Sequence, residues 1–188
     1  SLKIIEMGKK EGINITCEAT PHHFSFSDDE ILKKAYDTNF KMSPPLREIS
    51  DVKAVREALK SGLIDVIATD HAPHHTDEKI VEFDKAPFGI IGLQTLVPLT
   101  LKLVNEGVIS LERMVELTST NAAKMLNLKD KGRLAEGMLA DIAVIDPEIE
   151  YVYDEKINRS KSVNSPLFGK KLKGAATTTI KSGKIVYE

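Results

Sequence analysis

The chain has 188 residues, 41% of them hydrophobic, which is enough to bury the core of one domain or of one and a half. Its formal net charge is only −2 and it has no long basic run, so nucleic acid is a poor candidate partner. Cys17 is the single cysteine, which excludes an internal disulfide framework and is typical of a reducing compartment. No segment has the roughly 18 consecutive apolar residues of a membrane span, and no charged-then-apolar leader is evident at Ser1. We therefore expect a cytoplasmic protein that does not span a membrane.

The first part of the chain carries signals for a helix, a strand and a second helix. Apolar spacing predicts a helix over residues 2–11, and the alternating character of residues 13–20 predicts a short strand that Pro21 ends. Ser27 and Glu30 then have the spacing of a capping box, in which two side chains satisfy free backbone groups at the start of a helix.

The following segment contains two consecutive prolines. Residues 40–46 are expected to be extended, because a residue that precedes proline avoids the α region. Ser50 is the predicted cap of a helix that ends at Gly62. The apolar run at residues 64–69 then predicts a fully buried strand. This alternation of helix and strand is typical of parallel βα units.

Two more helical regions follow. An apolar helix is expected within residues 92–104, and Pro98 requires that this helix begins nearby or kinks there. Residues 110–128 predict two short helices that are separated around residues 118–120.

The texture of the chain changes near residue 132. Residues 132–188 are β-rich, and the Ser182-Gly183 pair between two β-rich runs predicts a hairpin. We therefore expect an α/β chain, with βα units over residues 1–131 and a small β domain over residues 132–188. Two parallel strands alone leave both edges of their sheet open, which indicates either more strands or membership of a larger barrel.

The candidate chemistry lies where the strand at residues 64–69 ends in Asp70, which His71, His74 and His75 follow. An unpaired carboxylate at the tip of a buried strand is costly, whereas the C-terminal ends of parallel strands are where α/β enzymes place metal ligands and acid–base residues. Asp70 is the first candidate for both roles, and the His74 imidazole is a candidate donor to a substrate anion. The alternative is a loop in which Asp70 caps a turn and the histidines are solvated.

Other residues have weaker signals. A buried Glu18 within the first strand would need a partner, so a cation is one candidate and Glu18 a second candidate metal ligand. For His22 and His23, core packing or a hydrogen bond to a neighbouring loop competes with metal binding. Gly89 and Gly92 fit a loop whose backbone approaches a small ligand, and an ordinary tight turn is the equal alternative.

Together, these segments resemble the dihydroorotases of the amidohydrolase superfamily, in their longer (type I) form. Order and spacing agree across essentially the whole chain. The matching segments are Cys17-Glu18-Ala19-Thr20-Pro21-His22-His23, Ser43-Pro44-Pro45-Leu46-Arg47, Thr69-Asp70-His71-Ala72-Pro73-His74, Pro87-Phe88-Gly89-Ile90-Ile91-Gly92-Leu93, Asn164-Ser165-Pro166-Leu167-Phe168-Gly169 and Ile180-Lys181-Ser182-Gly183-Lys184.

The resemblance implies a TIM-like (β/α) barrel, of which this chain carries the last two βα units and part of a small β domain. It also implies the reversible hydrolysis of dihydroorotate to N-carbamoyl-aspartate in pyrimidine biosynthesis, usually with zinc and otherwise with another divalent metal. Asp70 resembles the aspartate that binds the metal and acts as general base and acid. His74, Ser43, Ile91 and Gly92 resemble substrate-binding positions. The other metal ligands of the family would lie before Ser1, so we expect the 188 residues alone to be inactive.

One departure from the family keeps alternatives open. Ser43 stands where most relatives have asparagine or arginine, and it resembles the hydantoinases and dihydropyrimidinases. A hydantoinase-like, dihydropyrimidinase-like or allantoinase-like cyclic amidase is therefore one alternative. The other is a non-catalytic homologue that assembles with aspartate carbamoyltransferase. In each catalytic case the partner is a small-molecule substrate, and we also expect a homo-oligomer.

Overall fold

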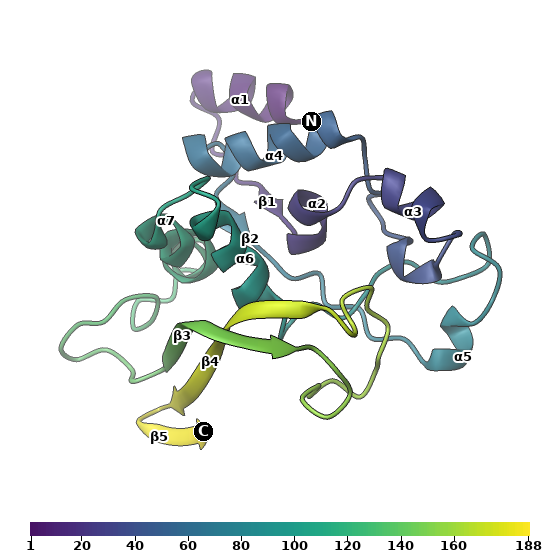
Figure 1. Ribbon diagram of the computed structural model, residues 1–188. Coiled ribbons are helices and arrows are strands. Elements are labelled where there is room, and N and C mark those ends of the chain that lie inside the picture. Colours follow the sequence, from purple (N-terminus) through teal and green to yellow (C-terminus); the bar gives the residue numbers. More distant parts are fainter.

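The computed structural model describes all 188 residues and places short helices around two separate sheets (Figure 1). The first sheet is a parallel pair, β1-β2, and the second is antiparallel in the order β3-β4-β5. The elements are α1 (Leu2–Lys10), β1 (Glu18–Ala19), α2 (Pro21–Ser25), α3 (Asp29–Lys33), η1 (Thr38–Phe40), α4 (Ile49–Ser61), β2 (Val66–Ile67), α5 (Thr76–Lys79), α6 (Leu96–Asn105), α7 (Leu111–Val115), the π-helical η2 (Glu116–Thr120), α8 (Asn121–Met125), β3 (Ile142–Val152), β4 (Lys171–Lys181) and β5 (Lys184–Tyr187).

The parallel pair confirms the predicted alternation of helix and strand. Glu18 lies opposite Val66 and Ala19 opposite Ile67. Both strands are only two residues long, which is shorter than the predicted runs. Each strand has a single neighbour, and the backbone hydrogen bonds of a sheet form only where two strands lie side by side. Figure 1 shows α1 and α4 near each other above this pair, with α6 below it and α7 to its left.

The chain after β1 turns directly into a helix. Pro21 ends the strand as expected, and it also opens the helix α2, because its fixed φ suits the first helical position. His22 and His23 therefore lie on one helical turn. Their ring centroids are 4.4 Å apart.

The helix caps were predicted with mixed success. The capping box at Ser27 and Glu30 was wrong, because α3 begins one residue later with Asp28 at its N-cap and no side-chain cap bond. Ser50 was also wrong as a cap, since Ile49 is already helical. Gly62, with a φ of 85°, ends α4 as predicted, and the Ser110 hydroxyl accepts a hydrogen bond at the start of α7.

The two later helical regions follow their sequence signals closely. Helix α6 begins at Leu96, so Pro98 lies in its first turn, where its missing N–H costs no helical hydrogen bond. The predicted break around residues 118–120 is instead a π-helical stretch, η2, that joins α7 to α8 without interruption. A wider turn at this point replaces the expected gap between two helices.

The β-rich segment shares its core with the helices. Gly174 of β4 has a φ of +90°, and a Cβ there would lie 2.2 Å from the Cδ1 atom of Leu101 in α6, so only glycine allows this contact. Leu167, Leu172 and Tyr153 belong to the same buried cluster as the apolar face of α6. One continuous core therefore contains residues from both sides of residue 132. The division into two domains at that residue stays a prediction. The hairpin at Ser182-Gly183 is confirmed, with positive φ at both residues.

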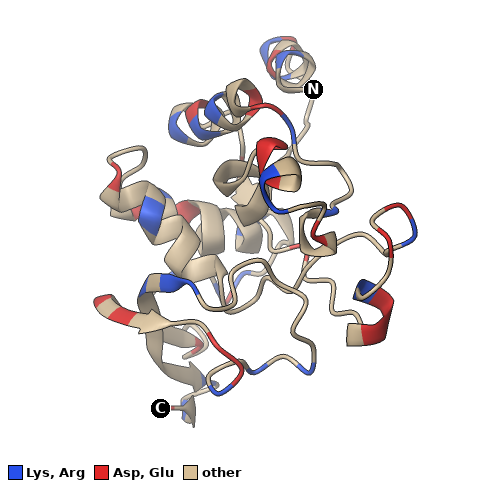
Figure 2. Ribbon diagram, turned by 45° about the vertical axis from the view of Figure 1, so that its right-hand side comes forward, with Lys and Arg blue, Asp and Glu red and all other residues tan.

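The surface carries mixed charges and much apolar side-chain area. Figure 2 shows both signs interspersed along the helices, and several of these charges pair within one turn, as Lys10 does with Glu6. All four residues of β5 are exposed, Ile185 and Val186 among them. None of the helices combines the length and the apolar character that crossing a lipid bilayer requires.

Candidate functional site

Asp70 lies three residues after the end of β2, on the C-terminal side of the strand, as the sequence predicted. Its side chain is exposed and its carboxylate makes no hydrogen bond or ion pair within the chain. Its φ of +47° lies in the left-handed region, which costs most L-residues roughly 1–2 kcal/mol and which aspartate and asparagine tolerate best. A strained, unpaired carboxylate at this end of a parallel strand is typical of a functional group rather than a structural one.

The structure brings Ser43 to the same edge. His23, just after β1, donates from Nε2 to the Pro44 carbonyl at 2.8 Å, since a carbonyl can only accept. Its Nδ1 atom accepts from the Thr20 hydroxyl at 2.6 Å. The neighbouring Ser43 is exposed and its hydroxyl makes no hydrogen bond. Because β1 and β2 are parallel neighbours, Ser43 and Asp70 both lie near the C-terminal edge of the pair.

His71 joins this edge to the segment that carries Ile91 and Gly92. It forms an isolated parallel bridge with Ile90, and its Nδ1 atom accepts the Gly92 amide at 3.0 Å and the Leu93 amide at 3.4 Å. These bonds leave the other ring nitrogen, Nε2, to carry the proton of the neutral imidazole.

Gly92 is required by close packing against the strand. A Cβ at this position would lie 2.8 Å from the Thr69 carbonyl oxygen. Its amide donates to His71 and its carbonyl accepts from Thr95, so both polar groups of the Gly92 backbone already have a partner within the chain. The Ile91 amide donates to the Asn164 carbonyl at 3.1 Å, but the Ile91 carbonyl accepts no hydrogen bond within the chain. That carbonyl is the one unused polar group of this pair.

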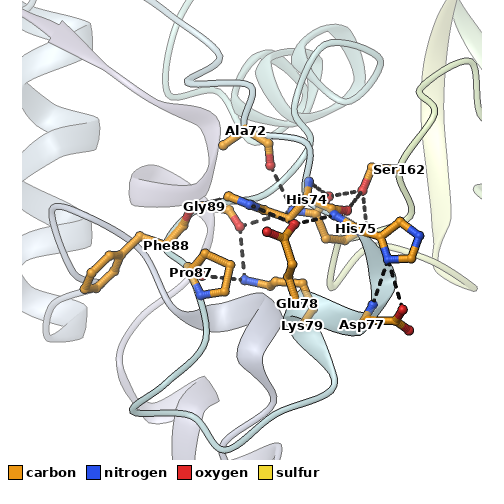
Figure 3. Close-up of polar contacts among 11 residues, drawn as sticks. Ala72, His74, His75, Asp77, Glu78, Lys79, Pro87, Phe88, Gly89 and Ser162 are labelled. Atoms are coloured by element: carbon orange, nitrogen blue, oxygen red, sulfur yellow. Dashed lines mark hydrogen bonds and ion pairs between the residues drawn. The ribbon is translucent and has the colours of Figure 1, made fainter.

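His74 is partly buried and points at the loop before Ile91 (Figure 3). Its Nε2 atom donates to the Phe88 carbonyl at 2.9 Å, and its Nδ1 atom lies 3.8 Å from a carboxylate oxygen of Glu78. Nδ1 is therefore the ring atom left for a ligand, and it can donate only when the ring carries both protons.

Lys79 holds the same loop from α5. Its ammonium group donates to the Pro87 carbonyl at 2.9 Å and to the Gly89 carbonyl at 3.3 Å (Figure 3). Burial lowers the pKa of Lys79 from its ordinary value, with the Asp37 charge opposing that shift. No sequence pattern indicates this role, because a buried lysine that bonds carbonyls cannot be distinguished from a surface lysine by sequence.

Asn164 and Ser162 are two further residues at this edge that residue-level reasoning missed. Both are buried, and both contact the His74 segment. Asn164 was noted only as part of a segment that resembles the family. A buried asparagine is not distinguishable from an exposed one by sequence spacing.

Glu18 differs from its prediction. It is exposed rather than buried, so it does not need a partner to offset a buried charge. Its register partner, Val66, lies four residues before Asp70, which is about 13 Å of extended chain. No three His, Cys, Asp or Glu side chains in the chain come together as a metal site. These 188 residues alone therefore do not supply the ligand set that a catalytic ion needs.

His22 is buried beside this edge and lacks a partner for its Nε2 atom. Burial, helped by the neighbouring His23, lowers the pKa of His22 to about 3. His22 therefore stays neutral at ordinary pH and belongs to the core, as one of its two predicted alternatives stated.

A cavity of about 310 Å³ adjoins the site. Its lining includes His71 and Ile91 from the strand end and Arg159 and Lys161 from the β-rich segment. Asp70 and His74 do not line it. The cavity is therefore a neighbour of the strand end rather than the space in front of the Asp70 carboxylate.

The chain is similar to curated dihydroorotases and to solved hydantoinase structures. It is 52% identical to the dihydroorotase of Geobacter metallireducens and 50% identical to that of Geotalea daltonii, and each match covers the whole chain but 44% of the relative. The fold matches the L-hydantoinase (dihydropyrimidinase) of Arthrobacter aurescens with a TM-score of 0.92 at 31% identity, and the dihydropyrimidinase of Brevibacillus agri with a TM-score of 0.91 at 25% identity. Both structural matches cover all of the chain and 42% of the solved protein.

These matches confirm the resemblance that the sequence motifs carried. The chain spans less than half the length of the curated relatives it matches. The model of the amidohydrolase family matches residues 6–186, which is nearly the whole chain. The chain therefore belongs to the amidohydrolase family.

Proposed function

We propose that this chain is part of a dihydroorotase, in which Asp70 transfers the proton during ring opening. The observation that carries the proposal is the Asp70 carboxylate, which is exposed and unpaired at the C-terminal end of a parallel strand. The similarity to dihydroorotases along the whole chain supports dihydroorotate as the substrate. Because the chain covers only 44% of those relatives, the activity belongs to the longer protein rather than to these residues alone.

The proposed reaction opens a cyclic amide with water. The water oxygen forms a bond to the ring carbonyl carbon while Asp70 accepts a proton from that water. The ring carbon–nitrogen bond then breaks, and Asp70 returns the proton to the leaving nitrogen, so the product is N-carbamoyl-aspartate. One carboxylate can serve both steps because the proton that it takes is the proton that it gives back.

We also propose that Asp70 supplies one ligand to a divalent ion, with zinc as the first candidate. The described residues do not fit a complete site, because they contribute no cluster of three ligands. The remaining ligands would have to come from the part of the protein that corresponds to the unmatched length of the relatives. Glu18 pairs with Val66, four residues before Asp70, so we do not assign it to the same ion.

Three groups near Asp70 are proposed to contact the substrate. The free carbonyl of Ile91 suits a ring N–H, which a cyclic amide offers. The unpaired hydroxyl of Ser43 suits a ring carbonyl, and the Nδ1 atom of His74 suits a carboxylate when the ring is protonated. Gly92 contributes by allowing the Ile91 segment to approach the strand rather than by a contact of its own.

The exposed apolar surface supports a larger fold. The β1-β2 pair has two open edges, and β5 is exposed along its full length. A longer protein that completes a barrel around β1 and β2 would pair the open edges of these two strands. The partial TIM-like barrel is therefore part of the proposal.

The test compares the full-length protein encoded by the reading frame that contains this chain with the 188-residue chain. We expect bound divalent metal and dihydroorotate hydrolysis in the full-length protein and neither in the 188-residue chain. A full-length protein that holds no metal and opens no cyclic amide would contradict the enzyme and leave the non-catalytic homologue, whose predicted partner is aspartate carbamoyltransferase.

The second candidate is a hydantoinase-like or dihydropyrimidinase-like cyclic amidase. Ser43 favours it, because a short uncharged side chain lies where the resemblance leads us to expect asparagine or arginine. The match to solved hydantoinases also supports it. Turnover of hydantoin or dihydrouracil in preference to dihydroorotate would establish this candidate in place of the first.

A further inference from the structure

We propose that Asn164 is a positioning residue that fixes the two loops carrying His74 and Ile91 relative to each other. Asn164 belongs to the β-rich segment, far in sequence from both loops. It is 4% exposed, and its side chain lies between the segment after Asp70 and the segment before Gly92.

The Asn164 amide uses all of its hydrogen-bonding capacity on these two loops and on Ser162. Its NH₂ group donates to the Ala72 carbonyl at 2.9 Å and to the Gly89 carbonyl at 3.2 Å. Its Oδ1 atom accepts the His74 amide at 3.3 Å and lies within hydrogen-bond distance of the Ser162 hydroxyl. Only an asparagine-like group, with two donors and one acceptor oxygen, satisfies this set of partners.

The backbone of Asn164 extends the connection. Its carbonyl accepts the Ile91 amide at 3.1 Å, so one residue contacts both loops that carry proposed substrate contacts. Ser162 reinforces the contact, because its hydroxyl also lies within hydrogen-bond distance of the His74 carbonyl (Figure 3). That hydroxyl has one proton and donates to one of its two acceptors at a time.

The loop itself depends on side chains for its shape. Its consecutive carbonyls at Pro87, Phe88 and Gly89 accept from Lys79, from His74, and from Lys79 with Asn164 together. His74 and Asn164 connect this loop to the Asp70 side of the site through their side chains, in addition to the backbone bridge at Ile90. Without the Asn164 amide, that bridge would still hold Ile90, but His74 and residues 86–89 would lose their fixed positions relative to it.

This inference rests on the proposed function, because it assigns Asn164 a role through His74 and Ile91 in binding the substrate. It places Asn164 outside the chemical step, since no atom of Asn164 contacts Asp70. The expected effect therefore falls on KM rather than on kcat.

The test is Asn164→Asp in the full-length protein. The substitution keeps the shape of the side chain but replaces its two N–H donors with an acceptor that faces the Ala72 and Gly89 carbonyls. We expect faster hydrogen exchange in peptides covering residues 71–75 and 86–92. We also expect KM for dihydroorotate to rise about tenfold or more, with kcat within about threefold. The reason is the loss of the two hydrogen bonds from the Asn164 NH₂ group to the Ala72 and Gly89 carbonyls.

The matched control is Asn121→Asp, which makes the same chemical change at a partly buried asparagine. The Asn121 amide donates to the Asp65 carbonyl, before β2, and bonds neither loop of the site nor Ser162. We expect its KM to stay within about twofold of the unaltered value. Ser162→Ala is the milder variant if Asn164→Asp does not fold, with the same direction of change in KM and a rise of a few-fold.

The outcomes separate the two proposals. Equal rises in KM for the Asn164 and Asn121 variants, or looser loops with an unchanged KM, would overturn the positioning role. An unaltered protein that does not open dihydroorotate would instead overturn the proposed function. In that case the KM comparison is made with hydantoin, and the absence of all turnover would overturn both.

Discussion

The two ends of the second parallel strand carry two aspartates with opposite surroundings. Asp65, before β2, accepts from the Lys9 ammonium at 2.8 Å and from the Cys17 amide at 2.9 Å. Asp70, after β2, has no partner and a left-handed backbone. One carboxylate is satisfied by the fold and the other is left available by it.

The fold stabilises the Asp65 end of the strand and leaves the Asp70 end free for the chemistry that we propose. Asp65 connects α1 to the start of both strands, together with the Arg113 guanidinium, which donates to the Ile64 carbonyl. At the Asp70 end, the contacts instead hold loops in place around an unpaired group. In α/β folds the C-terminal ends of the strands carry function, and the opposite ends carry stability.

The largest expected effect is the loss of activity in Asp70→Asn. Removing the proton carrier should lower kcat of the full-length protein by about 10²–10⁴-fold. The thermal unfolding temperature should stay nearly unchanged, because asparagine tolerates a positive φ and no partner is lost. An Asp70→Asn protein with near-normal turnover would contradict the proposed role of Asp70 in proton transfer.

The next effect is a loss of stability in acid that depends on His22. Its folded pKa of about 3 lies below its ordinary value, so between those two values the unfolded chain binds more protons. The stability that this provides is complete above about pH 6.5 and is lost as the pH falls toward 3. The loss is of the order of several kcal/mol.

The measurement is the free energy of unfolding of the full-length protein between neutral pH and pH 4, with and without His22→Leu. The variant should show a flatter pH dependence in this range, because it has no imidazole to protonate. Parallel curves of unfolding free energy against pH for the two proteins would show that protonation of His22 does not contribute to the acid sensitivity.

Asp65→Asn tests the structural end of the strand. It should lower the free energy of unfolding by about 1–3 kcal/mol, because the Lys9 ammonium loses the charge that faces it in a partly buried setting. The turnover of the folded protein should stay within about twofold. Glu6→Gln is the matched control: it breaks the exposed Glu6–Lys10 pair and should change stability by less than about 0.5 kcal/mol.

The smallest effect is expected for Ser43→Ala. The loss of one hydroxyl contact should raise KM by about fivefold, equivalent to roughly 1 kcal/mol, with no change in stability because the hydroxyl has no partner in the fold. Ser50→Ala, an exposed serine on α4, is the control. A larger rise for dihydrouracil than for dihydroorotate would indicate that Ser43 serves the dihydropyrimidinase-like alternative.

The sequence predicted the features that depend on local patterns. Gly62 ended a helix because only glycine accepts its left-handed φ at low cost, and Ser182-Gly183 formed a hairpin for the same reason. The position of Asp70 followed from an apolar run that stops at a charge. The helix starts at Ser27 and Ser50 were missed, because neighbouring residues could begin the helix as well.

Spacing and residue type were enough to predict the alternation of helix and strand, the family and the carboxylate at the strand end. They did not predict which polar groups remain free, because that depends on packing. The Gly92 amide is used by His71, the Ile91 carbonyl is not used, Glu18 is exposed, and Asn164 joins two loops. Hydrogen-bond partners that are distant in sequence are set by how the chain packs, and no local pattern encodes that pairing.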